Sequence, residues 1–142
     1  GMNYRMTDIQ AALGLSQLER LDEYVARRNI LAERYDQRLA DLPLDLPRRK
    51  MDLVSAFHLY VIRLKNASRR RATFDGLRAA GIGVNVHYIP VHLQPHYTRM
   101  GFCAGDFPAS EAYYARAITL PLYPTLTEAE QDRVIELLGT LL

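Results

Sequence analysis

The sequence contains little lysine and cysteine and has no long apolar run. Lys50 and Lys65 are its two lysines, and Cys103 is its single cysteine. One thiol cannot form a disulfide within the chain, and neither a signal peptide nor an apolar stretch of membrane-spanning length is visible. We therefore expect a cytoplasmic chain without a membrane partner. We also expect Cys103, in a loop punctuated by glycine, to be a small, partly buried residue and not a nucleophile.

An excess of charge is also absent. The formal net charge is +2, charged residues make up 24% of the chain, and no basic tail or alternation of basic and aromatic residues occurs. This balance argues against a nucleic acid as a partner. With 142 residues, of which 49% are hydrophobic, the chain can bury one core. The length therefore predicts a single domain over residues 1–142.

The first residues predict the start of a long helix. Thr7 and Gln10 have the spacing of a capping box, in which each side chain accepts a hydrogen bond from the backbone N–H of the other residue. Apolar residues then recur every three or four positions, which predicts a leading helix of about residues 8–42, ended by a proline-bounded connection. Because a helix start favours negative ligands, Asn3 and Arg5 are candidates for binding a phosphate or another anion. An asparagine before a helix is usually a turn residue, however, and an arginine there is usually a solvated charge.

The rest of the chain alternates between helices and short strands. Residues 56–64 are rich in β-branched and aromatic residues and predict a strand, central because nearly every position is apolar. Further strands are expected at 81–88 and 118–124, and further helices at 68–80 with Ser68 as N-cap, at 110–117, and after Thr127, where a second capping box begins. This order predicts an α/β fold, an α+β sandwich in which a small sheet of about three strands is covered by helices.

Histidine and tyrosine side chains gather between residues 87 and 97. The imidazoles of His87, His92 and His96 and the phenols of Tyr88 and Tyr97 can bind sugar hydroxyls and phosphates or transfer protons near neutral pH. Zinc is the alternative, but spacings of five and four on a proline-broken segment do not place three imidazoles on one helix face, and no carboxylate lies nearby in sequence. We therefore expect no metal. Any one of these histidines could also be a structural, hydrogen-bonded residue.

The opening run, Gly1-Met2-Asn3-Tyr4-Arg5-Met6-Thr7-Asp8-Ile9-Gln10-Ala11-Ala12-Leu13-Gly14, closely resembles the motif with which sugar-nucleotide aminotransferases of the DegT/DnrJ/StrS type enter their C-terminal half. The resemblance continues through Arg27-Arg28, Gly81-Ile82, residues 87–92 and residues 120–124 and covers the whole chain. It implies the small C-terminal domain of a fold-type I aminotransferase with its leading linker helix. The large domain, which carries the lysine that holds pyridoxal phosphate (PLP), would be absent.

The resemblance also assigns roles to individual residues. Asn3 resembles the residue that reaches into the neighbouring subunit and binds the PLP phosphate, and Arg5 would lie near the same pocket. His87, Tyr88 and His92 would line the sugar-nucleotide side. Within the family, the sequence is closest to transaminases of the pseudaminic acid route, which make UDP-4-amino-4,6-dideoxy-N-acetyl-β-L-altrosamine from a UDP-linked 4-keto-6-deoxy sugar.

Neither lysine suits the role of the PLP lysine. Lys50 lies in the exposed connection and Lys65 ends a strand. The resemblance therefore implies part of an enzyme that transfers an amino group from glutamate to a nucleotide-linked 4-keto-6-deoxy sugar in surface polysaccharide or glycan biosynthesis. We expect this part to have no catalytic residue, to bind no PLP alone and to be inactive alone. The alternative is a stand-alone, non-catalytic module that binds an anionic ligand such as a nucleotide sugar.

The leading helix also predicts association. Residues 9–18 are apolar on nearly all sides, so we expect them to be covered in a homo-oligomer or by an upstream large domain. Gly1 is either the glycine of the family motif or the remnant of a removed tag.

Overall fold

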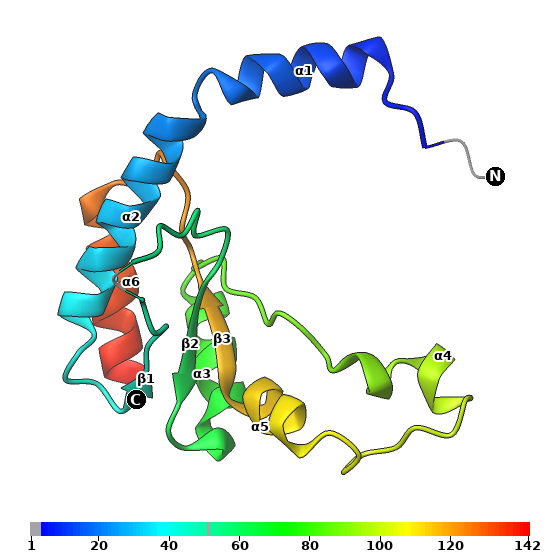
Figure 1. Ribbon diagram of the computed structural model, residues 1–142. Helices are drawn as coiled ribbons and strands as arrows, with labels where there is room; N and C mark the ends of the chain where they lie inside the picture. Colours follow the sequence, from blue (N-terminus) through cyan, green and yellow to red (C-terminus); the bar gives the residue numbers. More distant parts are fainter. Residues whose placement is uncertain (1–3, 51) are drawn as a thin grey trace.

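A three-stranded antiparallel sheet forms the centre of the chain in the computed structural model, which describes residues 4–50 and 52–142. The strands are β1 (Leu44–Asp45), β2 (Tyr60–Leu64) and β3 (Ala117–Leu120), in the order β1-β2-β3. Helices α2 (Leu21–Arg38), α3 (Arg70–Ala79) and α6 (Glu128–Leu141) lie on one side of this sheet (Figure 1). The predicted α/β class and the central place of the second strand are both confirmed.

The sheet buries one face completely. In β2, Tyr60, Ile62 and Leu64 are buried, whereas Val61 and Arg63, which point the other way, stay partly exposed. This alternation follows from the period of two along a strand. The buried residues meet α2, α3 and α6 in one core, which comprises Leu31, Ala32, Tyr35, Leu39, Leu44, Phe57, Tyr60, Ile62, Leu64, Leu77, Ile82, Val84, Ile118, Leu120, Leu122, Leu126, Val134, Ile135 and Leu138.

The leading helix predicted over residues 8–42 is two helices, α1 (Asp8–Leu18) and α2. Its capping box is confirmed, since the Gln10 N–H donates to Thr7 Oγ1 at 3.3 Å and the Thr7 N–H donates to Gln10 Oε1 at 2.9 Å. The helix breaks at Arg20, whose backbone leaves the helical region at φ −105° and ψ 2°. Neither glycine nor proline stands at the break, so periodicity alone could not place it.

Helix α2 anchors the loops around the core. Its Leu31, Ala32 and Tyr35 are buried. The guanidinium of Arg27 donates to the carbonyl of Leu126 at 3.0 Å, and that of Arg28 donates to the carbonyl of Phe57 at 2.9 Å. The Arg27-Arg28 pair therefore ties α2 to the two segments that lead into β2 and α6.

Two local predictions differ from the structure. Residues 81–88 do not form a strand: a single bridge joins Asn85 to Thr119, and the third strand is β1, inside the proline-bounded connection. The predicted N-cap Ser68 is wrong. A 3₁₀ turn, η1 (Ala67–Arg69), precedes α3, and Asn66 caps it by accepting from the Ser68 N–H at 3.0 Å. An asparagine side chain readily closes such a turn, so the helix begins differently from the prediction.

The last third follows the predicted order. Helix α3 is followed by Gly81 at φ +79°, a conformation that favours glycine. A 3₁₀ turn, η2 (Val91–Leu93), the short α4 (Pro95–Thr98) and α5 (Pro108–Arg116) come before β3. The second capping box is confirmed at Thr127, where α6 begins. Within the described residues, no helix is both long and apolar enough to cross a membrane.

Candidate functional site

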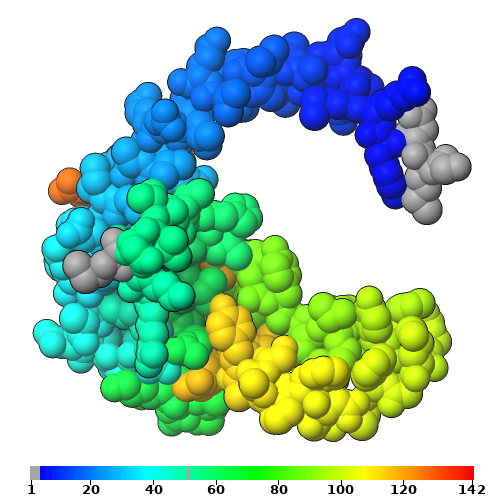
Figure 2. All heavy atoms as spheres, in the orientation of Figure 1, coloured from blue at the N-terminus to red at the C-terminus, as the bar shows by residue number. Residues whose placement is uncertain are grey.

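The chain curves around an opening. Figure 2 shows α1 on one side of it and residues 87–107, which we name the histidine segment, on the other. Apolar side chains are exposed on both parts. On α1 they are Ile9, Leu13, Leu15 and Leu18, and in the histidine segment they are Tyr88, Ile89, Val91, Tyr97, Met100, Phe102 and Phe107. Such surfaces commonly mark places where another chain or domain binds.

The N-terminal end of α1 is one part of the candidate site. Arg5 stands two residues before the N-cap Thr7 and is exposed, whereas Asn3 lies outside the described residues. The amides at the helix start and the guanidinium of Arg5 favour an anion at this end, whereas the carboxylate of Asp8 in the first turn opposes it. This end of α1 stays a candidate for binding an anion, and it lies across the opening from the histidine segment (Figure 1).

His87 and Tyr88 form the second part of the site. The ring of His87 is half-buried, with Nδ1 at 2.8 Å from Oγ1 of Thr119 on β3. Tyr88 follows through a cis peptide bond, and its ring packs edge-on against His87 with 4.6 Å between centroids. Tyr88 remains 68% exposed. One ring nitrogen of His87 is thus held by β3, and the adjacent phenol is open to a ligand.

His92 occupies a different environment. It is buried, its Nε2 lies 2.8 Å from Oε1 of Glu111, and its ring packs 4.8 Å from that of Phe107. The same carboxylate oxygen accepts the N–H of Gly105 at 2.8 Å. The Gly105 N–H and, after it, the hydrogen bond with His92 lower the pKa of Glu111. Glu111 therefore joins both the turn of His92 and the loop of Gly105 to the first turn of α5.

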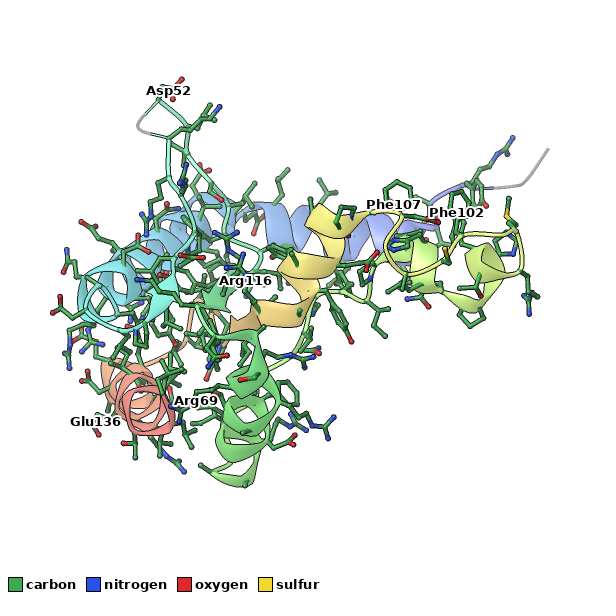
Figure 3. All side chains as sticks on the ribbon, turned by 90° about the horizontal axis from the view of Figure 1, so that it is seen from below. Asp52, Arg69, Phe102, Phe107, Arg116 and Glu136 are labelled. Atoms are coloured by element: carbon green, nitrogen blue, oxygen red, sulfur yellow. The ribbon has the colours of Figure 1, made fainter. Side chains whose placement is uncertain are left out.

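A cavity of about 300 Å³ opens beside His92. Figure 3 shows Phe102 and Phe107 together at this end of the molecule, with 6.1 Å between their ring centroids. The cavity is lined by Val91, His92, Tyr97, Phe102, Phe107 and Ser110. Its walls are mostly apolar, so it suits an apolar or planar group better than a free anion. His96 lies outside it, on the exposed α4.

The remaining candidates are a metal site and the thiol of Cys103. Within the described residues, no group of three or more His, Cys, Asp or Glu side chains could hold a metal ion. Cys103 is exposed, not partly buried as expected, since every residue of its loop, 99–107, is exposed. Its thiol donates to Asp106 at 3.4 Å, and this hydrogen bond raises the pKa of the thiol. A raised pKa lowers the fraction of reactive thiolate.

The structure brings some predicted residues together and separates others. His87, Tyr88 and His92 lie on one segment, whereas Arg5 precedes α1, the helix on the other side of the opening (Figure 1). The sequence did not point to Thr119 and Glu111, which form hydrogen bonds with the rings of His87 and His92. Each lies 19 or more positions away in the chain, in an element whose role looked structural. No local pattern marks such partners.

The positions of the two lysines bear on whether this chain could hold PLP. A PLP enzyme needs a lysine that reaches the cofactor. Lys50 is exposed in the connection after β1, and Lys65 is exposed just after β2. Neither lines the cavity at His92.

Comparisons with known proteins give a consistent picture. The model of the DegT/DnrJ/EryC1/StrS aminotransferase family matches residues 1–139. The spore coat polysaccharide biosynthesis protein SpsC of Bacillus subtilis is 40% identical over 96% of this chain and 36% of its own length. The chain thus spans about a third of the relatives that it matches.

Two solved structures superpose closely on the chain. Spr1654 from Streptococcus pneumoniae, a candidate sugar aminotransferase in its PLP form, aligns with a TM-score of 0.91 at 36% identity, over 96% of this chain and 36% of Spr1654. PseC of Helicobacter pylori, an aminotransferase involved in the biosynthesis of pseudoaminic acid, aligns with a TM-score of 0.90 at 27% identity, over 99% of this chain and 38% of PseC. The chain therefore belongs to the DegT/DnrJ/EryC1/StrS aminotransferase family.

Proposed function

We propose that this chain acts as the small domain of a PLP-dependent aminotransferase that transfers an amino group from glutamate to a nucleotide-linked 4-keto-6-deoxy sugar. The product would serve surface polysaccharide or glycan biosynthesis. The similarity to SpsC and to PseC supports a sugar as substrate. A UDP-linked 4-keto-6-deoxy-N-acetylhexosamine is the specific candidate, from the resemblance of the sequence.

The proposal rests on helix α1, whose apolar side chains are exposed. None of its residues is buried, and Ile9, Leu13 and Leu18 are 84%, 62% and 62% exposed. A short helix with exposed apolar side chains is stable only when another protein surface covers it. In relatives nearly three times as long, the rest of the polypeptide is available for that role. We therefore propose that α1 joins this domain to a large domain or packs against a second copy.

In this proposal the chain contributes binding and orientation. PLP, when bound, supplies the electron sink for amino transfer. Asn3 would bind the cofactor phosphate of a neighbouring subunit, although it lies outside the described residues. Arg5 would meet an anionic group beside the start of α1, where the helix dipole strengthens the attraction.

The histidine segment would hold the sugar nucleotide. Tyr88, the most exposed of the predicted contacts there, offers a phenol to a sugar hydroxyl or phosphate oxygen. His87 offers the ring nitrogen that Thr119 does not engage. His92 would line the same side through its cavity while Glu111 keeps its ring in place.

The test is a transaminase assay with PLP, glutamate and a UDP-linked 4-keto-6-deoxy-N-acetylhexosamine. We expect no activity from this chain alone, and activity when it is mixed with the separately expressed first two thirds of a family member such as Spr1654. Tyr88→Phe should lower the activity of the mixture, whereas Tyr123→Phe, a matched exposed tyrosine outside the segment, should not. Binding of the nucleotide sugar by the chain without any activity in the mixture would instead favour a non-catalytic binding module.

A further inference from the structure

A second, unassigned groove runs from the outer face of β2 along the loop that joins β1 to β2. Two cavities of about 360 and 600 Å³ adjoin there and share Pro47, Arg48 and Leu59 as walls. The smaller one lies over the outer side of β2, between the end of β1 and α5. The larger one continues along the loop that joins β1 to β2. This groove involves none of the residues of the histidine segment.

The groove is strongly basic for a chain of nearly balanced charge. Of the residues that the structure describes, four cations line it, namely Arg48, Arg49, Lys50 and Arg63, and no carboxylate does. Arg49 is already engaged, because its Nε donates to Asp36 at 2.6 Å and its guanidinium stacks over Phe57 at 4.8 Å. Among the described residues, Arg48 and Lys50 form no ion pair. Their donors are therefore available to a ligand.

Arg63 is only partly neutralised. The carboxylate of Asp45 uses the same oxygen, Oδ2, for Arg63 at 3.6 Å and for Arg116 at 3.2 Å. One negative charge cannot balance two guanidinium groups, so positive charge remains beside β2. The other acidic residue of the loop, Asp52, points away from the body at the tip (Figure 3), where its charge is screened by solvent.

The floor of the groove is apolar. In the smaller cavity, Leu46, Leu59 and Val61 supply apolar lining, and Tyr113 lines it as well. Arg48 and Arg63 line the same cavity. Guanidinium groups bind phosphate and carboxylate oxygens through paired hydrogen bonds, and a tyrosine hydroxyl can add another. An apolar base beside such donors fits a ligand with a charged end and an apolar body.

We propose that this groove is a binding site for a small amphipathic oxyanion. Arg48 and Arg63 bind its phosphate or carboxylate, Tyr113 donates a further hydrogen bond, and its apolar body lies on Leu59 and Val61. The site is separate from the proposed aminotransferase role and does not depend on it.

The experiment is an NMR titration of the ¹⁵N-labelled 142-residue chain at constant ionic strength. The probes are inorganic phosphate, phenyl phosphate and benzoate. Phenyl phosphate should cause saturable shifts around Arg48, Arg63 and Tyr113 and should bind about tenfold more tightly than phosphate, because its ring covers apolar surface. The comparison of phenyl phosphate with benzoate decides whether the natural ligand carries a phosphate or a carboxylate.

Substitutions in the groove should change the affinity for phenyl phosphate in opposite directions. Arg48→Gln and Arg63→Gln should each weaken phenyl phosphate binding, whereas Asp45→Asn, which releases Arg63, should strengthen it. Arg78→Gln, an exposed arginine on α3, is the matched control and should change nothing. Unchanged core resonances establish that each variant is folded. Shifts that do not saturate, equal affinity for phosphate and phenyl phosphate, or equal effects of Arg78→Gln and Arg48→Gln would overturn the proposal.

Discussion

The hydrogen bond between His87 and Thr119 should account for the position of the exposed Tyr88. Thr119 is 6% exposed, and its Oγ1 lies 2.8 Å from Nδ1 of His87. Thr119→Val keeps the shape of the side chain and removes the hydroxyl, so one nitrogen of a half-buried ring loses its partner. A neutral hydrogen bond of this kind contributes about 1 kcal/mol to folding.

A double-mutant cycle isolates this bond from the other effects of each substitution. The free energy of unfolding is measured in urea for the wild type, Thr119→Val, His87→Ala and the double variant. We expect a coupling energy of about 1 kcal/mol between the two positions. Thr119→Ser, which keeps the hydroxyl, should preserve most of the coupling.

Additive effects of the two substitutions would contradict this prediction. If the two single effects sum to the double effect within about 0.3 kcal/mol, the two side chains do not interact in solution. Loss of coupling with Thr119→Ser as well would point to backbone changes at the Asn85 bridge instead.

Three further predictions concern other parts of the chain. The Gly105 N–H is the main cause of the lowered pKa of Glu111. The ionised Glu111 therefore stabilises the fold above the ordinary glutamate pKa of 4.5, and this stabilisation is lost as the pH falls through the lowered pKa. The stability advantage of the wild type over Glu111→Gln in urea should therefore vanish in acid, and an advantage independent of pH would contradict this. Tyr60→Phe should lower the free energy of unfolding by about 2 kcal/mol, because the Tyr60 hydroxyl donates to the charged carboxylate of Asp36 on α2. Tyr35→Phe, which loses a hydrogen bond to the carbonyl of Pro121, should lower it by about 1 kcal/mol. Equal losses of stability in thermal unfolding would contradict a stronger bond to the charged group. Leu13→Asp should reduce self-association at high protein concentration, measured by sedimentation, because it places a charge on the exposed apolar surface of α1. A wild-type chain that is already monomeric at that concentration would contradict this prediction.

Local patterns predicted those parts of the fold that depend on neighbouring residues. Both capping boxes, at Thr7 and Thr127, and the stop at Gly81 follow from short motifs, and the structure contains all three. The strand around Tyr60 could be predicted as central because its apolar character reflects burial on the sheet. The break at Arg20 could not, since no residue type marks it.

The candidate site was predictable only in part for the same reason. Tyr88 and His87 stood out because polar rings cluster in the sequence. Their supports did not, because Thr119 and Glu111 come from β3 and α5 and meet the segment only after folding. The burial of His92 likewise depends on Phe107, which approaches it through a long loop.

The central claim is that this chain can serve as the small domain of a sugar aminotransferase. The most direct measurement replaces the corresponding last third of Spr1654 with this chain and follows the absorbance of PLP when glutamate is added. Sedimentation and circular dichroism establish that the chimera is folded. We expect the folded chimera to bind PLP and the cofactor to take the amino group from glutamate. A folded chimera that binds PLP no better than the truncated enzyme without this chain would contradict it.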